Sequence, residues 1–338
     1  MRTATRYAAI LSIAALQSVH GQSASTPSGV RTLLSALAHD SMGGRATGTP
    51  GAAMAARFVA DAMRNAGIEP AGDSGYFQRV AVAKDSAAGA RRMSFRVLPS
   101  LADLDTVEAQ RRVAAVNVVG MIKGSDPALQ SEHVLVDAHY DHIGIGRPVD
   151  GDSINNGADD DASGTVAVLE IARQMAAGPP PKRTVIFMAT IGEERGLLGT
   201  RWYIQHPLIP LTQMVANLEI EMIGRPDSLA GGAGRAWLTG YERSSMGDAL
   251  AAAGIPIVPD RRPDQQFFQR SDNIAFARVG IPAHTLSSFN LHTDYHRPSD
   301  DVDKVDFDHM AAVINAAVKA ARLLSDGPKP EWKPNGRP

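Results

Sequence analysis

The stretch TVIFMATIGEERGLLGT, residues 184–200, joins an unbroken apolar run to two adjacent glutamates and then to a segment of helical character. The apolar run predicts a buried strand, and the residues from Leu197 to His206 predict a helix directly after it. The two neighbouring carboxylates, Glu193 and Glu194, repel each other at the point where the strand ends. We therefore expect a function at this strand end that requires both.

The same alternation of elements continues on both sides of this stretch. Strand-like runs cover residues 114–122, 133–138, 184–190, 214–223 and 281–288, and helical runs cover 49–67, 163–178, 197–206, a stretch after Arg243, and about 307–324. Strands that alternate with helices predict an α/β fold in a single domain, with a mixed, mostly parallel central sheet covered by helices on both faces. Ligands of such sheets bind beyond the carboxyl ends of the strands, so the residues after each run are the candidates.

Composition excludes several classes of protein. The 338 residues are 44% hydrophobic and 21% charged, which is ordinary for a globular protein. The formal charge of -2 becomes -4 without residues 1–21, since that segment carries Arg2 and Arg6 and no acid, and this mildly acidic chain shows no basic footprint for nucleic acid. The absence of cysteine excludes disulfides, thiolate metal ligands, a cysteine nucleophile and a lipid-modified cysteine.

The two ends of the chain differ from the middle. Residues 1–21 have two arginines, a short apolar run and then small residues, which is the layout of a secretory signal peptide, with a buried N-terminal helix as the alternative. The apolar run is too short to span a membrane, and no later segment reaches that length. Residues 22–28 are expected to form a flexible leader and the proline-rich residues 327–338 a flexible tail, which leaves 22–326 as one domain.

Carboxylates and histidines follow four of the predicted strands and precede one helix. Each group alone has an ordinary explanation as a helix cap or a surface side chain. Together they place more negative charge in one region than a folded protein accommodates without a cation. Histidine and carboxylate ligands without sulfur suit zinc or a neighbouring divalent metal, and their number fits two metals bridged by one carboxylate. The candidates are His139, Asp141 and His142; Asp159, Asp160 and Asp161; Glu193 and Glu194; Glu221; and His292, Asp294 and His296.

Five ordered motifs carry a resemblance to a known family. They are HYDHIG, GADDDASG, GEERGLLGT, EMIGR and YHRPSDDVDK, and they are preceded by the segment SMGGRATGTPG. In this order they resemble the co-catalytic dizinc aminopeptidases of metallopeptidase family twenty-eight, which have a zinc exopeptidase fold. The resemblance extends from about Leu33 to Leu324.

The resemblance implies a role for each motif residue. His139, Asp160 and Glu221 would hold one zinc ion, while Asp160, Glu194 and His296 would hold the second. Asp160 is then the bridging carboxylate, Asp141 orients His139, and Glu193 is the general base. His142 and His292 are expected to be structural or rim residues, because the implied ligand set is complete without them. The residues that bind the substrate are not identified by the motifs.

The chain departs from the family pattern at two positions. Most relatives have aspartate where this chain has Glu221, a longer carboxylate that should still reach a metal. Asn273, in the sequence RSDN, replaces a common histidine, and this change concerns the substrate pocket. There is also no long insertion before the first metal motif, so the extra protease-associated domain of some relatives is not expected.

The implied function is that of a secreted or periplasmic zinc aminopeptidase acting on peptides, with two zinc ions and Glu193 as the base. Carboxypeptidase action is an alternative, because no residue that would hold a free amine is identifiable. A glutaminyl cyclase-like enzyme shares the fold but uses one zinc ion, and some relatives of the fold are non-catalytic binding ectodomains. The filled ligand positions favour a hydrolase over both.

Overall fold

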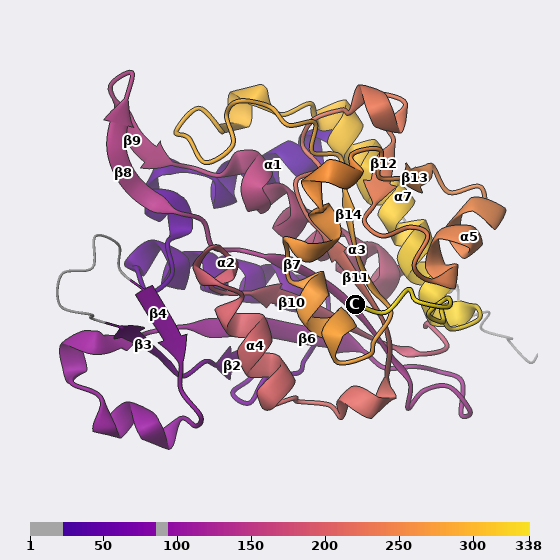
Figure 1. Cartoon of the computed structure of the whole chain (residues 1–338), viewed down its shortest axis with the longest axis horizontal. Helices are drawn as coiled ribbons and strands as arrows, with labels where there is room; N and C mark the ends of the chain where they lie inside the picture. Colours follow the sequence, from indigo (N-terminus) through magenta and orange to yellow (C-terminus); the bar gives the residue numbers. More distant parts are fainter. Residues whose placement is uncertain (1–22, 86–93) are drawn as a thin grey trace, which may run out of the picture.

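The protein is built around one mixed β-sheet, shown in Figure 1 by a computed structural model that describes residues 23–85 and 94–338. The predicted signal peptide lies outside these residues. The sheet has nine strands in the order β1-β6-β10-β7-β11-β14-β12-β13, and β2 also pairs with β6. The strands are β1 (Glu69–Pro70), β2 (Phe77–Arg79), β6 (Val116–Ile122), β7 (His133–His139), β10 (Thr184–Thr190), β11 (Met214–Ile220), β12 (Ala236–Leu238), β13 (Ile257–Pro259) and β14 (Ala283–Ser287).

The centre of the sheet is parallel and its flanks are antiparallel. Strands β10, β7, β11 and β14 are parallel neighbours, whereas β6 runs antiparallel to β10 and β12 runs antiparallel to β14. Every residue of β7 and β10 is buried, which explains why these strands appear in the sequence as unbroken apolar runs rather than as alternating ones. The predicted α/β fold with a mixed sheet is confirmed.

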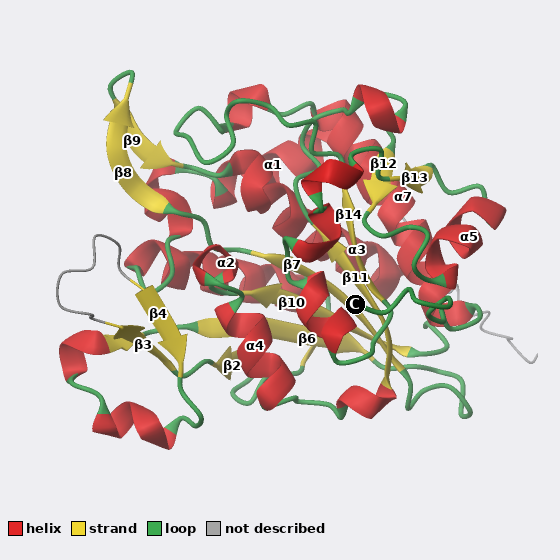
Figure 2. Ribbon diagram, viewed as in Figure 1, coloured by secondary structure: helices red, strands yellow, loops and turns green. Residues whose placement is uncertain are grey.

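Helices cover both faces of the sheet (Figure 2). One face carries α1 (Pro27–Leu37), α2 (Pro50–Asn65), α3 (Gly164–Ala177) and α7 (Phe307–Asp326), whose apolar residues share a core with Val134, Val136 and Phe187. The other face carries α4 (Leu198–Gln205) and α6 (Asn273–Arg278), which pack on Leu135, Ile186 and Met188. Helix α5 (Ser245–Ala252) contacts α7 and β13.

Helix α2 begins where its sequence signals place the start. The hydroxyl of Thr49 accepts a hydrogen bond from the backbone N–H of Ala52, and Pro50 occupies the first helical position. This cap satisfies one of the backbone donors that a helix leaves free at its first turn. The helix ends at Asn65, just before Gly67, whose φ of +75° suits glycine.

Several smaller elements were not predicted. A three-stranded sheet of β3 (Val82–Asp85), β4 (Ser94–Val97) and β5 (Arg112–Val113) stands beside the main sheet. The hairpin of β8 (Gly144–Val149) and β9 (Asp152–Asn155) projects from the body at the upper left of Figure 1. Among the residues described, no helix has both the length and the apolarity that crossing a bilayer requires.

Both segments that were expected to be flexible make contacts with distant parts of the chain. Ser25 is buried and its hydroxyl donates to a carboxylate oxygen of Glu170 on α3 at 2.5 Å, so the predicted leader is anchored. In the C-terminal segment, the indole N–H of Trp332 donates to the carbonyl of Gly280 at 2.9 Å. Trp332 also forms a β-bridge with Ser244. The partners of Ser25 and Trp332 lie far away in the sequence. The composition of the two end segments therefore could not predict these contacts.

Candidate metal centre

The predicted site residues meet at one edge of the sheet because their strands are parallel neighbours. His139 is the last residue of β7, Glu193 and Glu194 follow β10, and Glu221 follows β11. The carboxyl ends of these three strands point the same way, with His139 paired in register with Thr190. Asp160 comes from the turn before α3, and His296 comes from the loop after β14. The structure therefore brings together all five predicted ligands.

One group of possible ligands consists of His139, Asp160 and Glu221. The Nε2 atom of His139 lies 3.4 Å from Asp160 Oδ1 and 3.9 Å from Glu221 Oε1. Each residue offers one ligand atom, and all of these atoms lie within 4.8 Å of one another. Atoms at these distances from one another are close enough to bind one shared ion.

A second group shares Asp160 and adds Glu194, His296 and His142. The Nε2 atom of His296 lies 3.2 Å from Asp160 Oδ2 and 3.2 Å from Glu194 Oε2. The Nδ1 atom of His142 lies 2.7 Å from Glu194 Oε1. Asp160 thus presents one oxygen to each group, as a bridging carboxylate would. The sequence did not lead us to expect His142 here, although it stands three residues after His139 in the same motif.

The residues fit a pair of metal ions. Buried polar atoms are normally satisfied by hydrogen bonds. Within the described chain, His139 Nε2, His142 Nδ1, Asp160 Oδ2 and Glu194 Oε1 are buried and have no such partner. These four atoms belong to the two candidate groups, and imidazole nitrogens with carboxylate oxygens form the donor set that zinc takes in proteins. One cation in each group would give all four atoms a partner.

The resemblance implies that Asp141 orients His139. In the structure, the backbone carbonyl of Asp141 makes the closer contact with His139, and the carboxylate lies farther away. The Nδ1 atom of His139 is 3.1 Å from the backbone carbonyl of Asp141 and 3.8 Å from its carboxylate. That carboxylate instead accepts hydrogen bonds from the Thr47 hydroxyl and the backbone N–H groups of Gly192 and Glu193. Asp141 therefore fixes the turn that carries the two glutamates, while its main chain positions His139.

The neighbours of Asp160 are held away from the two groups. Asp161 accepts from the backbone N–H groups of Gly164 and Met222, at 3.0 Å each. Asp159 accepts from the backbone N–H of Gly224 at 2.6 Å and contacts His292 Nε2 at 3.0 Å. Of the three consecutive aspartates, only Asp160 is left for a metal. His292 lies outside both groups, consistent with the structural role expected for it.

A buried arginine ties together the loops around the site. The side chain of Arg45 is fully buried and donates to the carbonyl oxygens of Tyr140 (2.8 Å), Leu37 (3.1 Å), Asn156 (2.6 Å) and Gly157 (2.9 Å). Burial lowers the pKa of Arg45 to about 10, against the attraction of nearby aspartates, so the guanidinium still carries its charge at neutral pH. It links the segment before α2 to the loops that present His139 and Asp160.

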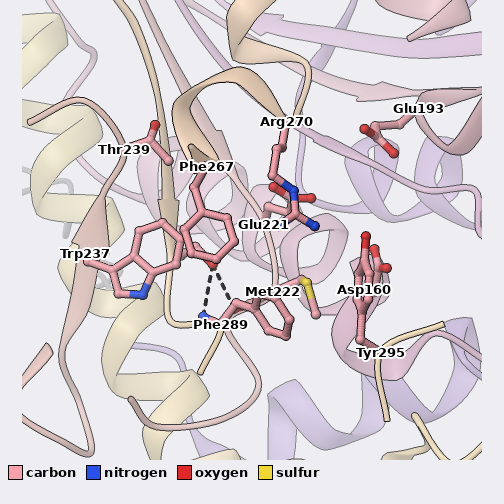
Figure 3. Close-up of a pocket in the computed structure, with 11 residues that line it drawn as sticks. Asp160, Glu193, Glu221, Met222, Trp237, Thr239, Phe267, Arg270, Phe289 and Tyr295 are labelled. Atoms are coloured by element: carbon pink, nitrogen blue, oxygen red, sulfur yellow. Dashed lines mark hydrogen bonds between the residues drawn. The ribbon is translucent and has the colours of Figure 1, made fainter. Parts of the chain in front are cut away.

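Glu193 is free to act as a base. It lines the pocket together with Asp160 and Glu221 (Figure 3). Glu194 instead faces His142 and His296. In the part of the chain that is described, the carboxylate of Glu193 has no hydrogen bond. Burial raises the pKa of Glu193 well above its usual range, with Glu221 and Glu194 adding to the effect and His139 opposing it. A carboxyl group with a raised pKa takes up a proton more readily near neutral pH.

The pocket has an aromatic wall that sequence reasoning missed. Figure 3 shows Trp237, Phe267 and Phe289 on one side, opposite Glu193, Asp160 and Tyr295. Trp237 is buried, as expected of a core residue, yet it also lines this pocket. The three aromatic residues of the wall come from β12, from the turn before α6 and from the loop after β14, so no local motif joins them. Asn273 is not among the lining residues, and its amide donates to the carbonyl of Phe268.

Tyr295 and Arg270 complete the polar part of the pocket. Burial raises the pKa of Tyr295, and the carboxylates of Asp160, Glu221 and Glu194 raise it further, so the phenol keeps its proton. Arg270 lies over the ring of Phe267, with its guanidinium carbon 5.1 Å from the ring centre. It makes no ion pair with any residue that the structure describes.

Comparisons with known proteins show the family and the fold. A model described as Peptidase family M28 matches residues 117–321. A "Vacuolar membrane protease" of Coccidioides posadasii is 30% identical over 204 residues, a match that covers 56% of this chain and 18% of that protein. The chain therefore spans less than a fifth of the length of that relative.

Two solved structures share the fold. An aminopeptidase from Aneurinibacillus sp. strain AM-1 superposes with a TM-score of 0.63 at 16% identity, over 91% of this chain and 96% of that one. Porphyromonas gingivalis glutaminyl cyclase superposes with a TM-score of 0.61 at 15% identity, over 87% of this chain and 97% of that one. At these identities the likeness concerns the fold.

Proposed function

The chain belongs to peptidase family M28, and from this premise we propose that it is a zinc-dependent exopeptidase, specifically an aminopeptidase that releases the N-terminal residue of peptides. One observation supports this most strongly. Two groups of possible metal ligands share Asp160, and they lie beside a pocket lined by Glu193, whose carboxylate has no hydrogen bond among the described residues.

In this proposal the two groups hold two zinc ions, which would acidify a water molecule and polarise the carbonyl of the peptide bond. Glu193 accepts a proton from the attacking water and passes it to the leaving amine. Tyr295, whose phenol stays protonated and faces the pocket, donates a hydrogen bond to the carbonyl oxygen as negative charge develops there. The aromatic wall receives the side chain of the released residue, which favours apolar and aromatic residues.

Arg270 supports a second candidate, a carboxypeptidase. Its guanidinium lines the same pocket, and such a group binds a carboxylate well. If Arg270 pairs with the C-terminal carboxylate of the substrate, the residue released is the last one of the peptide. A glutaminyl cyclase-like enzyme is a third candidate, and it differs by needing a single zinc ion.

One assay separates these candidates. Zinc-loaded protein is incubated with dipeptides of apolar residues, blocked either at the amino end or at the carboxyl end. An aminopeptidase cleaves the carboxyl-blocked set and spares the amino-blocked set, a carboxypeptidase shows the reverse, and a cyclase instead converts peptides with N-terminal glutamine. Cleavage of neither dipeptide set would reject the exopeptidase proposal.

We propose further that the protein is exported, with residues 1–21 as a signal peptide, residues 22–326 as one peptidase domain and the mature chain starting near Gln22. The charged and apolar layout of the first residues supports this. Intact-mass measurement of protein recovered from outside the cytoplasm tests it. Recovery with Met1 still present would contradict the proposed cleavage.

A further inference from the structure

His142 has the properties of a metal ligand, although the family resemblance does not include it among the implied ligands. Its side chain is fully buried, with Nδ1 2.7 Å from Glu194 Oε1 and 3.8 Å from Asp160 Oδ2. Its ring stands edge-on to that of His296, with 5.5 Å between the ring centres. Nδ1 therefore points into the same small space as the other three members of the second group.

An ordinary hydrogen bond does not account for this contact. His142 Nδ1 and Glu194 Oε1 are close enough for an ion pair, but their directions do not meet the requirements of a hydrogen bond, and neither atom has a hydrogen-bond partner among the described residues. The second ring nitrogen, Nε2, also has no partner there. Without a bound cation, this buried imidazole would leave both ring nitrogens without a hydrogen bond, and a buried unsatisfied polar group costs folding free energy. A shared cation satisfies Nδ1 and Glu194 Oε1 together.

The backbone next to His142 is shaped to admit its ring. A Cβ atom at Gly157 would lie 2.5 and 2.6 Å from two ring atoms of His142, closer than real contacts allow. Gly157 also has a φ of +56°, and its carbonyl is held by Arg45. Position 157 must be glycine for the ring to occupy its present place, so the loop and the imidazole form one arrangement.

We propose that His142 is the fourth protein ligand of the metal held by Asp160, Glu194 and His296. The inference rests on the proposed two-metal function and makes its two sites unequal. The site with four protein ligands is closed, whereas the site of His139, Asp160 and Glu221 has three and keeps a position open. The closed site then binds its metal more tightly, and the open site is the one that loses its ion first.

X-ray absorption of protein loaded with one equivalent of zinc tests this directly. We expect two imidazole ligands on that zinc, from His142 and His296, and three imidazoles over two ions at full loading. In His142→Ala we expect one imidazole at one equivalent and a metal affinity at least ~100-fold lower, beyond the effect of a residue that only orients a ligand. His292→Ala, which removes a nearby histidine bonded to Asp159, should leave both measurements unchanged.

The outcomes separate this inference from the proposed function. Two imidazoles over two ions in fully loaded wild-type protein would overturn the role of His142 while leaving a two-metal peptidase intact. Three imidazoles in a protein that cleaves no peptide would support His142 as a ligand and reject the peptidase. The wild-type measurement does not depend on whether His142→Ala folds, and circular dichroism shows whether the variant does.

Discussion

At the scale of single residues, Glu193 and Glu194 show how identical neighbours take different roles. Glu194 faces His142 and His296, and these histidines outweigh burial and Asp160, which act the other way, so the pKa of Glu194 falls to about 2. Glu193 faces the pocket, where burial raises its pKa. The proposed mechanism needs both, because a carboxylate bound to a cation is a poor base and a second, unbound carboxylate must therefore accept the proton.

Exchanging each glutamate for glutamine tests this division of roles. Glu193→Gln should keep both metals and near-native substrate binding but lower kcat by ~10²–10⁴-fold, the usual contribution of a general base. Glu194→Gln should instead lose metal, with partial rescue by excess zinc. Metal content and kcat are measured for both. If Glu193→Gln lost metal and Glu194→Gln kept it, the two assignments would be reversed.

His284 provides a residue-level prediction away from the metal centre. Its Nδ1 contacts the carbonyl of Thr239 at 2.7 Å, so Nδ1 carries the hydrogen, and Nε2 accepts from the hydroxyl of Ser244. Burial lowers the pKa of His284 to about 4, with Arg243 adding to the effect. The imidazole is therefore neutral in the folded protein at pH values where the unfolded chain already binds a proton.

This difference makes stability depend on pH in a known direction. Above the unfolded pKa of about 6.5 the contribution is complete, and it is lost as the pH falls towards 4, up to about 3 kcal/mol. Urea unfolding at several pH values measures it. His284→Gln should reduce the acid-induced loss of stability by that amount, and an identical pH profile in both proteins would contradict the prediction.

At the scale of elements, the sequence predicted the parts that have their own periodicity and missed the parts that depend on partners. Strands β6, β7, β10, β11 and β14 were expected because each forms a run of five or more mostly buried residues, and in all but β14 most of these residues are apolar. The strands near one edge of the sheet, β12 and β13 with three residues each, are too short to show a pattern. The predicted leader, residues 22–28, includes the first residues of α1. The start of α1 is held by tertiary contacts, such as that of Ser25 with α3, which the local sequence does not reveal.

The residues of the site also divide into those that the sequence could predict and those that depend on tertiary contacts. Motif residues next to strand ends could be found because the parallel sheet gathers strand ends at one edge. His142 was set aside because a complete ligand set left it no role, and only its position against Glu194 changes that. The pocket wall could not be predicted, since Trp237, Phe267 and Phe289 are brought together by tertiary packing.

The loops between elements depend on Arg45, which gives a prediction at this scale. Lysine keeps the charge but has no planar fork to reach four carbonyls, so Arg45→Lys leaves buried acceptors unpaired. We expect a loss of about 3 kcal/mol in the free energy of unfolding, at ~1–3 kcal/mol for each unsatisfied group. Arg57→Lys on the exposed side of α2 is the matched control and should change little. Equal stabilities in denaturant titrations would reject the structural role of Arg45.

At the scale of the whole molecule, the candidate metal centre joins segments that are far apart in the sequence. Its candidate ligands extend from His139 to His296, and the helices behind them include both α1 and α7. Ions bound there stabilise the folded state and do not find the same ligands in the unfolded chain. Metal should therefore govern overall stability as well as catalysis.

Removing the metals tests this link. A chelator should abolish peptide hydrolysis and lower Tm, and added zinc or cobalt should restore both. Elemental analysis of the fully active protein should find two ions per chain. One tightly bound ion at full activity would argue for the single-zinc alternative, and an unchanged Tm after complete removal of metal would show that the centre is not coupled to folding.

The hydrogen bonds between Ser25 and Asn315 have a consequence for how the protein is made. The two residues are separated by 290 positions, and they fasten the start of α1 to α7. Contacts this distant form late, because the intervening chain must first be ordered. During synthesis, a nascent chain that has emerged only as far as β11 has neither His296 nor α7. Such a chain lacks one of the candidate metal ligands, and the second group of ligands is complete only after the loop that follows β14 has emerged.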